Sequence, residues 1–239
     1  MAQEQQETTR INKYLSHKGY CTRKGADELV LSGKVYINGK KAVLGDKVTP
    51  RDTVEVRNAM PKKFIYLAYY KPRGVVTHGA QNGEKDIATL LHKKDPTLDV
   101  FPVGRLDKNS HGLILLTNDV RIVEPLLSPE HTHEKEYKVQ VNERIRSDFT
   151  EKMSSGIDIG GYTTKDCVVE KVDKHTFRIT LTEGKNHQIK RMANALNYTV
   201  TDLKRIRIMN IRLRNQRPGT YREIKGEELR ELLVLLGVK

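Results

Sequence analysis

Residues 104–117 read Gly-Arg-Leu-Asp-Lys-Asn-Ser-His-Gly-Leu-Ile-Leu-Leu-Thr, a short polar loop followed by an apolar segment. The apolar part predicts a buried strand over 113–116. Just before it, Asp107 lies close to two basic residues, Arg105 and Lys108. Loops attached to a rigid sheet often hold reactive groups, but Gly, Asp, Asn and Ser are also the usual residues of turns. The stretch therefore indicates either a catalytic loop or a plain connection.

The chain after residue 63 contains more strand patterns than helix patterns. The predicted strands are 64–70, 113–116, 137–141 and 177–181, and the predicted helices are 187–197 and 227–236. The first of these strands ends before Pro72, because proline cannot donate to a strand ladder. Since strands outnumber helices and do not alternate with them, we expect an α+β fold with a mixed, largely antiparallel sheet flanked by helices.

Composition shifts divide the chain into four parts. Residues 1–9 are polar and rich in Gln and Glu, which predicts a disordered tail. Residues 10–57 combine two short helical patterns with several short strand patterns, which predicts a small domain. Residues 58–63 are expected to be a linker, and residues 64–239 a larger domain.

Local signals within the small domain are specific. Thr22 predicts the N-cap of the second helix and Gly33 its end. The Asn38-Gly39 pair, between alternating apolar residues, predicts a hairpin. Basic residues outnumber acidic ones, and the cations that flank the predicted helices are Arg10, Lys13, Arg23 and Lys24. These four indicate either a phosphate-binding face or an ordinary solvated helix face.

The overall composition narrows the classes of protein. The chain has 239 residues and a net charge of +13, and such an excess usually indicates a polyanionic partner, most often nucleic acid. Cys21 and Cys167 are far apart in sequence, which gives no support for a zinc ribbon or a redox pair and fits a reducing compartment. No signal peptide and no run of about 18 apolar residues is present. We therefore expect a cytoplasmic protein without membrane contact.

A second polar cluster lies at 184–192, which reads Gly-Lys-Asn-His-Gln-Ile-Lys-Arg-Met. Asn186 predicts a helix N-cap, which puts Lys190 and Arg191 in the first turns of that helix. Cations at this end oppose the helix dipole. They indicate a facing anion, either a carboxylate or a phosphate, unless they are simply solvated.

Two further segments are ambiguous. Residues 131–137 contain His and Glu, but their spacing matches no common zinc pattern, so no metal site is predicted. Tyr137 either packs in a strand or stacks on an unpaired base. Within 204–214, alternation puts Arg205 and Arg207 on one face, as expected for a basic strand along an RNA backbone or for an edge strand protected by charge.

Taken together, these motifs resemble the RsuA/RluB/RluE/RluF family of ribosomal pseudouridine synthases, at 104–113, 133–137 and 184–192. The Arg-Ile-Asn-Lys-Tyr-Leu segment at 10–15 and the hairpin at 33–40 resemble the S4-type RNA-binding module. The segments Asp-Lys-Asn-Ser-His (107–111) and Arg-Ile-Arg-Ile-Met-Asn (205–210) resemble the RluF type, which acts on 23S ribosomal RNA.

The resemblance implies isomerisation of uridine to pseudouridine in ribosomal RNA, by base flipping and without a cofactor. It assigns the essential aspartate to Asp107, its basic partner to Lys190 with Arg191 as the adjacent candidate, and the stacking aromatic residue to Tyr137. Arg105 matches a position that holds the flipped nucleotide open. The other expected RNA contacts are Lys108, Arg191, Arg205 and Arg207, with Arg10, Lys13, Arg23 and Lys24 in the S4-type module. Whether Asp107 acts as a nucleophile or as a base stays open.

Two other functions compete with this one. A non-catalytic RNA-binding or ribosome-assembly protein with the same fold is the main alternative. A metal-dependent nuclease ranks last, because the sequence contains no convincing cluster of metal-binding carboxylates. We expect 23S ribosomal RNA as the substrate, with a transfer-RNA stem-loop open as a second one. We also expect a monomer without a metal.

Overall fold

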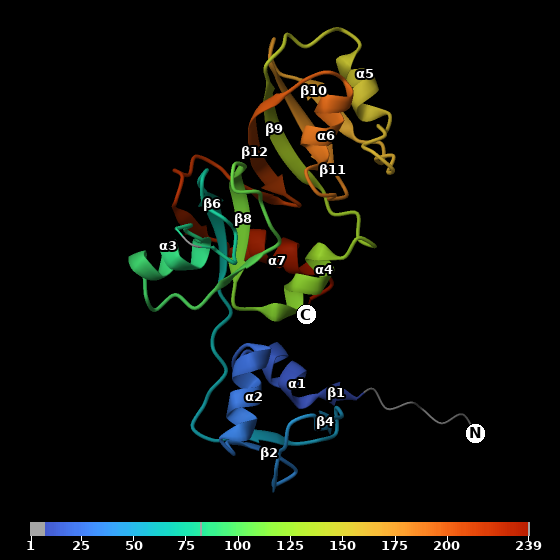
Figure 1. The fold of residues 1–239 in the computed structure, drawn as a ribbon. Coiled ribbons are helices and arrows are strands. Elements are labelled where there is room, and N and C mark those ends of the chain that lie inside the picture. Colours follow the sequence, from blue (N-terminus) through green and yellow to red (C-terminus); the bar gives the residue numbers. More distant parts are fainter. Residues whose placement is uncertain (1–7, 82, 239) are drawn as a thin grey trace, which may run out of the picture. The chain divides into compact units, whose positions relative to one another are not determined.

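The chain forms two compact units in a computed structural model that describes residues 8–81 and 83–238 (Figure 1). The first unit comprises the chain up to Ile65 together with Asn118–Arg121. The second comprises Tyr66–Thr117 and the chain from Ile122 onward. The short segment Asn118–Arg121, which follows β8 (His111–Thr117) in the chain, groups with the first unit by its contacts.

The first unit packs two helices against short strands. The helices are α1 (Ile11–His17) and α2 (Arg23–Leu31), and the strands are β1 (Thr9–Arg10), β2 (Val35–Ile37), β3 (Lys40–Lys41), β4 (Lys47–Val48) and β5 (Val54–Val56). Strand β1 pairs with β4, and β3, β2 and β5 form an antiparallel sheet. The buried core consists of Ile11, Leu15, Ala26, Val30, Val35, Ala42 and Val48. Of the predicted disordered tail, residues 1–7 lie outside the described residues, whereas Thr9 is in a strand.

Three local predictions for this unit are confirmed. The Thr22 hydroxyl accepts a hydrogen bond from the Gly25 amide at 3.2 Å, which caps α2. Helix α2 ends at Leu31, and Gly33 follows it with a φ of +67°. Asn38 and Gly39 both have positive φ, as a tight hairpin turn between β2 and β3 requires. These features depend on neighbouring residues, so short sequence signals suffice to predict them.

The second unit contains a nine-stranded sheet of order β10-β11-β9-β12-β8-β6-β14, with β7 on β8 and β13 on β12. The strands are β6 (Tyr66–Lys71), β7 (Phe101–Val103), β8 (His111–Thr117), β9 (Lys135–Val141), β10 (Val168–Lys171), β11 (Thr176–Leu181), β12 (Val200–Ile208), β13 (Ile211–Arg212) and β14 (Tyr221–Glu223). Within the described chain, β12 and β8 are parallel and the other pairs in this sheet are antiparallel. The predicted α+β fold with a mixed, largely antiparallel sheet is confirmed.

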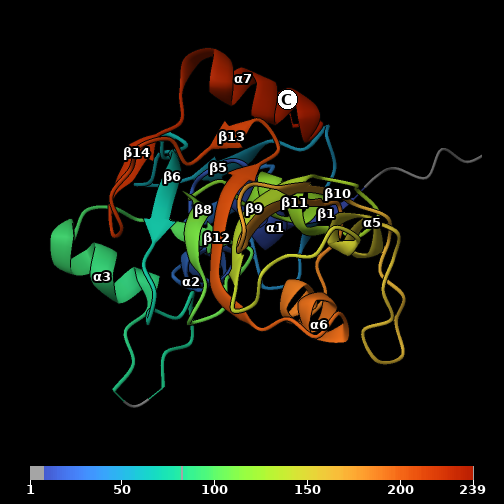
Figure 2. The same cartoon turned by 90° about the horizontal axis from the view of Figure 1, so that it is seen from above.

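Helices flank this sheet. They are α3 (Ile87–Lys94), α4 (Val123–Leu127), α5 (Phe149–Ser154), α6 (Gln188–Ala195) and α7 (Gly226–Leu235), with a 3₁₀ turn η1 (Val120–Ile122). Helices α5 and α6 lie beside β9–β11 (Figure 2), where Phe149, Met153, Ile189 and Met192 join a buried cluster with Val139 and Phe177. No helix in the described part of the chain is both long enough and apolar enough to cross a membrane.

Gly112 allows β8 and β12 to approach each other closely. Its φ is +108°, and a Cβ atom there would lie 2.2 Å from the Arg205 carbonyl oxygen. Any larger residue would push the two parallel strands apart. Since β8 follows directly after the Asp107 loop, this glycine sets the position of the loop relative to β12.

We predict that Gly112→Ala destabilises the protein far more than Gly219→Ala. Both glycines have positive φ, so an alanine at either position costs about 1–2 kcal/mol of backbone strain. Nothing lies within 4 Å of a Cβ at Gly219, so only Gly112→Ala adds a clash with backbone. We expect that variant to lose about 3 kcal/mol or more of the free energy of unfolding, measured by urea denaturation. Equal losses in the two variants would contradict the packing argument.

Candidate active site

A cavity of about 820 Å³ opens in the second unit, and Asp107 lies in its wall. Its walls come from the loop around 104–108, the segments 76–79 and 183–189, and strands β9 and β12. A volume of this size accommodates a nucleotide. The two polar motifs of the sequence, far apart along the chain, therefore line one cavity.

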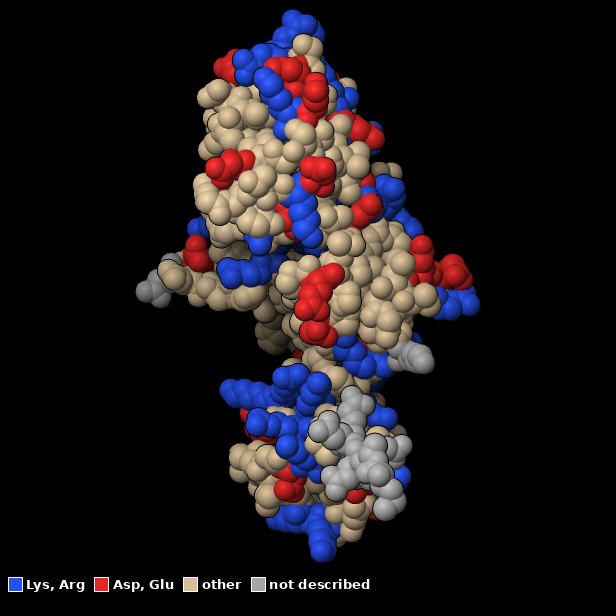
Figure 3. Space-filling model, turned by 90° about the vertical axis from the view of Figure 1, so that its right-hand side faces the viewer, with Lys and Arg blue, Asp and Glu red and all other residues tan. Residues whose placement is uncertain are grey.

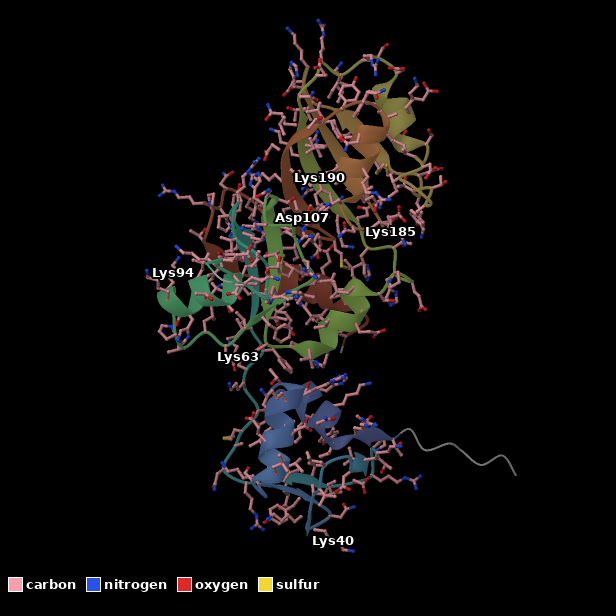
Figure 4. All side chains as sticks on the ribbon, viewed as in Figure 1. Lys40, Lys63, Lys94, Asp107, Lys185 and Lys190 are labelled. Carbon is pink, nitrogen blue, oxygen red and sulfur yellow. The ribbon has the colours of Figure 1, made fainter. Side chains whose placement is uncertain are left out.

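The cavity-lining Asp107 forms an ion pair with Lys190, with 3.3 Å between Lys190 Nζ and Asp107 Oδ2. Figure 4 shows the two labelled side chains close together, with Lys94 remote on α3. His187 adds a second nitrogen, since its Nε2 lies 3.6 Å from Asp107 Oδ1. The Asp107 side chain keeps 36% of its surface exposed, so the carboxylate is open to a substrate.

Helix α6 presents Lys190 because its apolar face is fixed in the core. Ile189, Met192 and Ala193 are buried, which turns Lys190 toward Asp107. The predicted N-cap at Asn186 is wrong: the cap position is His187, at a φ of +50° and without a side-chain cap bond. Gln188 organises this end instead, by accepting from the Lys185 amide and donating to Glu183.

Hydrogen bonds fix the backbone of the Asp107 loop from several sides. The Thr77 hydroxyl accepts from the Leu106 amide at 3.0 Å and donates to the Leu106 carbonyl at 2.9 Å. The Gly74 amide donates to the Lys108 carbonyl at 2.8 Å, and Arg205 Nη1 donates to the Arg105 carbonyl at 3.4 Å. The carboxylate is thus held by a preorganised loop rather than by a mobile connection.

Lys71, which no sequence motif singled out, lies fully buried behind this loop. Its Nζ donates to the carbonyls of Ser110 at 2.8 Å, Pro72 at 3.0 Å and Lys108 at 3.4 Å. Burial lowers the pKa of Lys71 from 10.5 to about 8; Asp107 opposes this shift and Arg205 adds to it. A lysine at the end of an otherwise apolar strand was the one available sequence signal.

We predict that stability depends on pH through Lys71. Between pH 8 and 10.5 the folded protein has lost a proton that the unfolded chain still binds, so rising pH favours folding at this residue. Lys71→Met removes this dependence. The stability advantage of wild type over this variant should therefore grow across that window by up to about 3 kcal/mol, measured by urea denaturation. A matched Lys138→Met variant controls for the loss of an exposed lysine, and a difference independent of pH would contradict the prediction.

Arg191 and Arg205 both donate hydrogen bonds to backbone carbonyls. Arg191 donates from Nη2 to the carbonyls of Ile159 and Gly160, so it supports a neighbouring turn and does not face Asp107. Arg205 is 4% exposed and donates from Nε to the Leu113 carbonyl at 2.7 Å. Of the two candidates left open by the sequence, Lys190 is the one that contacts Asp107.

The prediction that Arg205 and Arg207 share one face of β12 is wrong. Arg207 pairs with Glu134 and Glu136, each at 2.8 Å, and its side chain is 14% exposed. A bulge between Arg205 and Arg207 breaks the simple alternation on which the prediction depended. The two glutamates come from the His- and Glu-rich segment, so they serve as ion-pair partners in the sheet.

The remaining candidates line the cavity. Tyr137 faces it from β9, directly opposite Arg205 in the strand register. Arg105 is exposed on the loop, and Lys108 is half-exposed and paired with Glu84 at 2.8 Å. Among the described residues no group of three or more His, Cys, Asp or Glu side chains is arranged to hold a metal ion.

In the first unit, Arg10, Lys13, Arg23 and Lys24 are all exposed, and none is paired with a carboxylate among the residues that the structure describes. Lys13 and Arg23 both act on His17, whose pKa is lowered by burial first and then by these two cations. Lys13 and Arg23 therefore lie close to His17 and add positive charge to the same part of this unit. Figure 3 shows many Lys and Arg side chains on this unit. Such a surface suits phosphate contacts.

Comparison with known proteins identifies the family. Residues 65–195 match the model of the RNA pseudouridylate synthase family, and residues 9–54 match the model of the S4 domain. The chain belongs to the RNA pseudouridylate synthase family. The matched region contains both polar motifs, so Asp107 and Lys190 lie within it. The predicted enzyme class, and RNA as the substrate of this synthase, are confirmed.

The relatives of this synthase include two proteins named dual-specificity RNA pseudouridine synthase RluF. The Salmonella typhi and Escherichia coli (strain K12) proteins are each 41% identical over 236 residues, covering 96% of this chain and 80% of theirs. The uncharacterized RNA pseudouridine synthase YtzG of Bacillus subtilis (strain 168) is 35% identical, covering 92% and 96%. The predicted resemblance to the RluF type is confirmed.

One solved structure, described as a crystal structure of pseudouridylate synthase, matches the chain with a TM-score of 0.68 and 27% sequence identity. The match covers 93% of this chain and 99% of that chain. The S4 unit and the larger sheet unit are therefore both elements of a known architecture.

Proposed function

We propose that this synthase converts uridine to pseudouridine in 23S ribosomal RNA, with Asp107 as the catalytic carboxylate. The observation that carries the proposal is the Asp107–Lys190 pair, held in the wall of a nucleotide-sized cavity inside the matched domain. The ammonium group favours a charged carboxylate through Coulomb attraction. The preorganised loop keeps that carboxylate at a fixed position, where it acts on the ribose as nucleophile or base.

The remaining cavity residues have complementary roles in this proposal. Tyr137 stacks on the flipped uracil from β9, and its hydroxyl is available for proton transfer. Arg105, exposed at the loop, holds the displaced nucleotide by its phosphate, and Lys108 contributes a second cation at the same rim. Flipping a base costs a few kcal/mol, which binding elsewhere on the RNA has to offset.

We also propose that residues 10–57 form the RNA-binding module, joined by a linker at 58–63 to the catalytic domain at 64–239. The module supplies binding energy away from the reacting base. A cytoplasmic, monomeric protein is part of the proposal, and light scattering on the purified protein tests the monomer. The name of the RluF relatives, "dual-specificity", supports a search for a second RNA substrate such as a transfer-RNA stem-loop.

The direct test is Asp107→Asn. We expect wild type to form pseudouridine in 23S ribosomal RNA and the variant to form none, because an amide can act neither as a nucleophile nor as a base here. Pseudouridine mapping on RNA incubated with each protein measures this. The control is Asp158→Asn, a substitution at an exposed turn outside the cavity. RNA binding by wild type without product on any ribosomal fragment would favour the non-catalytic alternative.

A second prediction concerns the cationic surface of the S4 unit. Replacing four of its exposed cations, Arg10, Lys13, Arg23 and Lys24, by Gln should weaken RNA binding and reduce its salt dependence, by a slope of about 1 for each phosphate that is no longer bound. The single-turnover rate at saturating enzyme should stay near that of wild type, because the cavity is untouched. Filter binding at several salt concentrations measures the first effect. Unchanged affinity would refute the role of this surface.

A further inference from the structure

Two cations in the cavity lining have no acidic partner among the described residues. Arg205 and Lys135 both line it, and neither forms an ion pair with a carboxylate in residues 8–81 and 83–238. Glu183, another residue of the cavity lining, accepts hydrogen bonds from the Tyr162 hydroxyl at 2.5 Å and the Gln188 amide at 2.8 Å. A buried cation is costly when it is unpaired, so this arrangement calls for a physical explanation.

Both cations carry N–H groups that are not fully used in hydrogen bonds. Arg205 Nη2 is buried and has no hydrogen-bond partner, although Nε and Nη1 both donate to carbonyls. Lys135 Nζ makes one long bond, 3.3 Å, to the His133 carbonyl. Burial lowers the pKa of Lys135, and the charge of Arg205 lowers it further, so the two groups are close enough to repel. A ligand that accepts hydrogen bonds and carries negative charge would relieve both effects.

The positions of Arg205 and Lys135 relative to Asp107 indicate which part of the RNA reaches them. Arg205 Nη1 donates to the carbonyl of Arg105, two residues before Asp107, so the Arg205 guanidinium lies against the Asp107 loop. Tyr137, the proposed stacking residue, lies opposite Arg205 in the strand register. If the ribose meets Asp107, the base extends toward Tyr137 and the two cations. RNA phosphates, in contrast, meet the exposed cations Arg105 and Lys108 at the rim.

We propose that Arg205 and Lys135 bind the carbonyl oxygens of the flipped uracil and stabilise its negative charge during the reaction. This inference rests on the proposed isomerase function. When the bond from C1′ to N1 breaks, its electron pair leaves with the base, and the charge spreads onto the two carbonyl oxygens. The pair returns when C5 bonds to C1′; the proton lost from C5 is balanced by one gained at N1. Cations fixed at those oxygens favour the charged intermediate over the neutral substrate.

The test compares the Lys135→Met variant with a control variant, Lys138→Met. Lys138 is an exposed lysine on the same strand, β9. Single-turnover rates and dissociation constants are measured on 23S ribosomal RNA transcripts made with uridine or with 5-fluorouridine. We expect Lys135→Met to lower the single-turnover rate on uridine RNA about 100-fold, because the charged intermediate loses a stabilising cation. Its RNA affinity should stay within twofold of wild type. Lys138→Met should keep both the rate and the affinity of wild type. Fluorine withdraws electrons and stabilises the anion itself. On 5-fluorouridine RNA the reaction is followed as loss of 5-fluorouridine by nucleoside mass spectrometry. Lys135→Met should slow this loss less than 10-fold, compared with about 100-fold on uridine RNA.

Each other outcome overturns the inference. Weaker RNA binding with an unchanged saturating rate would make Lys135 a phosphate contact. Equal rate losses on both RNAs would make its role purely structural, as would recovery of the rate at low temperature. Arg205→Lys, which keeps the charge but removes the free Nη2, should lose rate in the same pattern. If wild type itself forms no pseudouridine, the proposed function fails; if wild type is active and Lys135→Met equals it, only this inference fails.

Discussion

The architecture of the site depends on one buried ammonium. Lys71 ends the strand β6 and donates to the carbonyls of Lys108 and Ser110, just after Asp107, and of Pro72. A polar loop buried against a sheet would otherwise leave these carbonyls unsatisfied, at a cost of about 1–3 kcal/mol each. The same charge lies near Asp107, so it stabilises the loop and the carboxylate together. A displacement of about 1 Å at such a position is enough to slow catalysis severely.

The positive charge of the chain is divided among groups with different tasks. Lys71 and Arg191 are bound to backbone carbonyls and hold turns in place. Arg207 is neutralised by two glutamates in the sheet. The exposed cations of the S4 unit and of the cavity rim are the ones that we propose as phosphate contacts. The net charge of +13 correctly indicated a nucleic-acid partner, but it does not distinguish a cation that binds RNA from one that supports the fold.

Predictions from sequence succeeded where the cause was local. Thr22 caps its helix, and Asn38-Gly39 forms its hairpin, because backbone conformation there depends on adjacent residues. The prediction for Asn186 failed because Gln188 is anchored by Glu183, a residue outside the helix. The alternation predicted for β12 failed at a bulge, which is a property of its pairing with β9. The partner of Gln188 and the strand that pairs with β12 both lie elsewhere in the chain, so neither can be predicted from the local sequence.

The sequence by itself determined the α+β class, the family and the two polar motifs that meet in the cavity, because motif residues and hydrophobic periods are written along the chain. Only the tertiary structure decided that Lys190, and not Arg191, faces Asp107. Adjacent residues on a helix point about 100° apart, and the buried face of α6 fixes which one reaches Asp107. It also decided the roles of Lys71 and Arg205, since burial and partners far apart in the chain, rather than residue type, determine what a cation does.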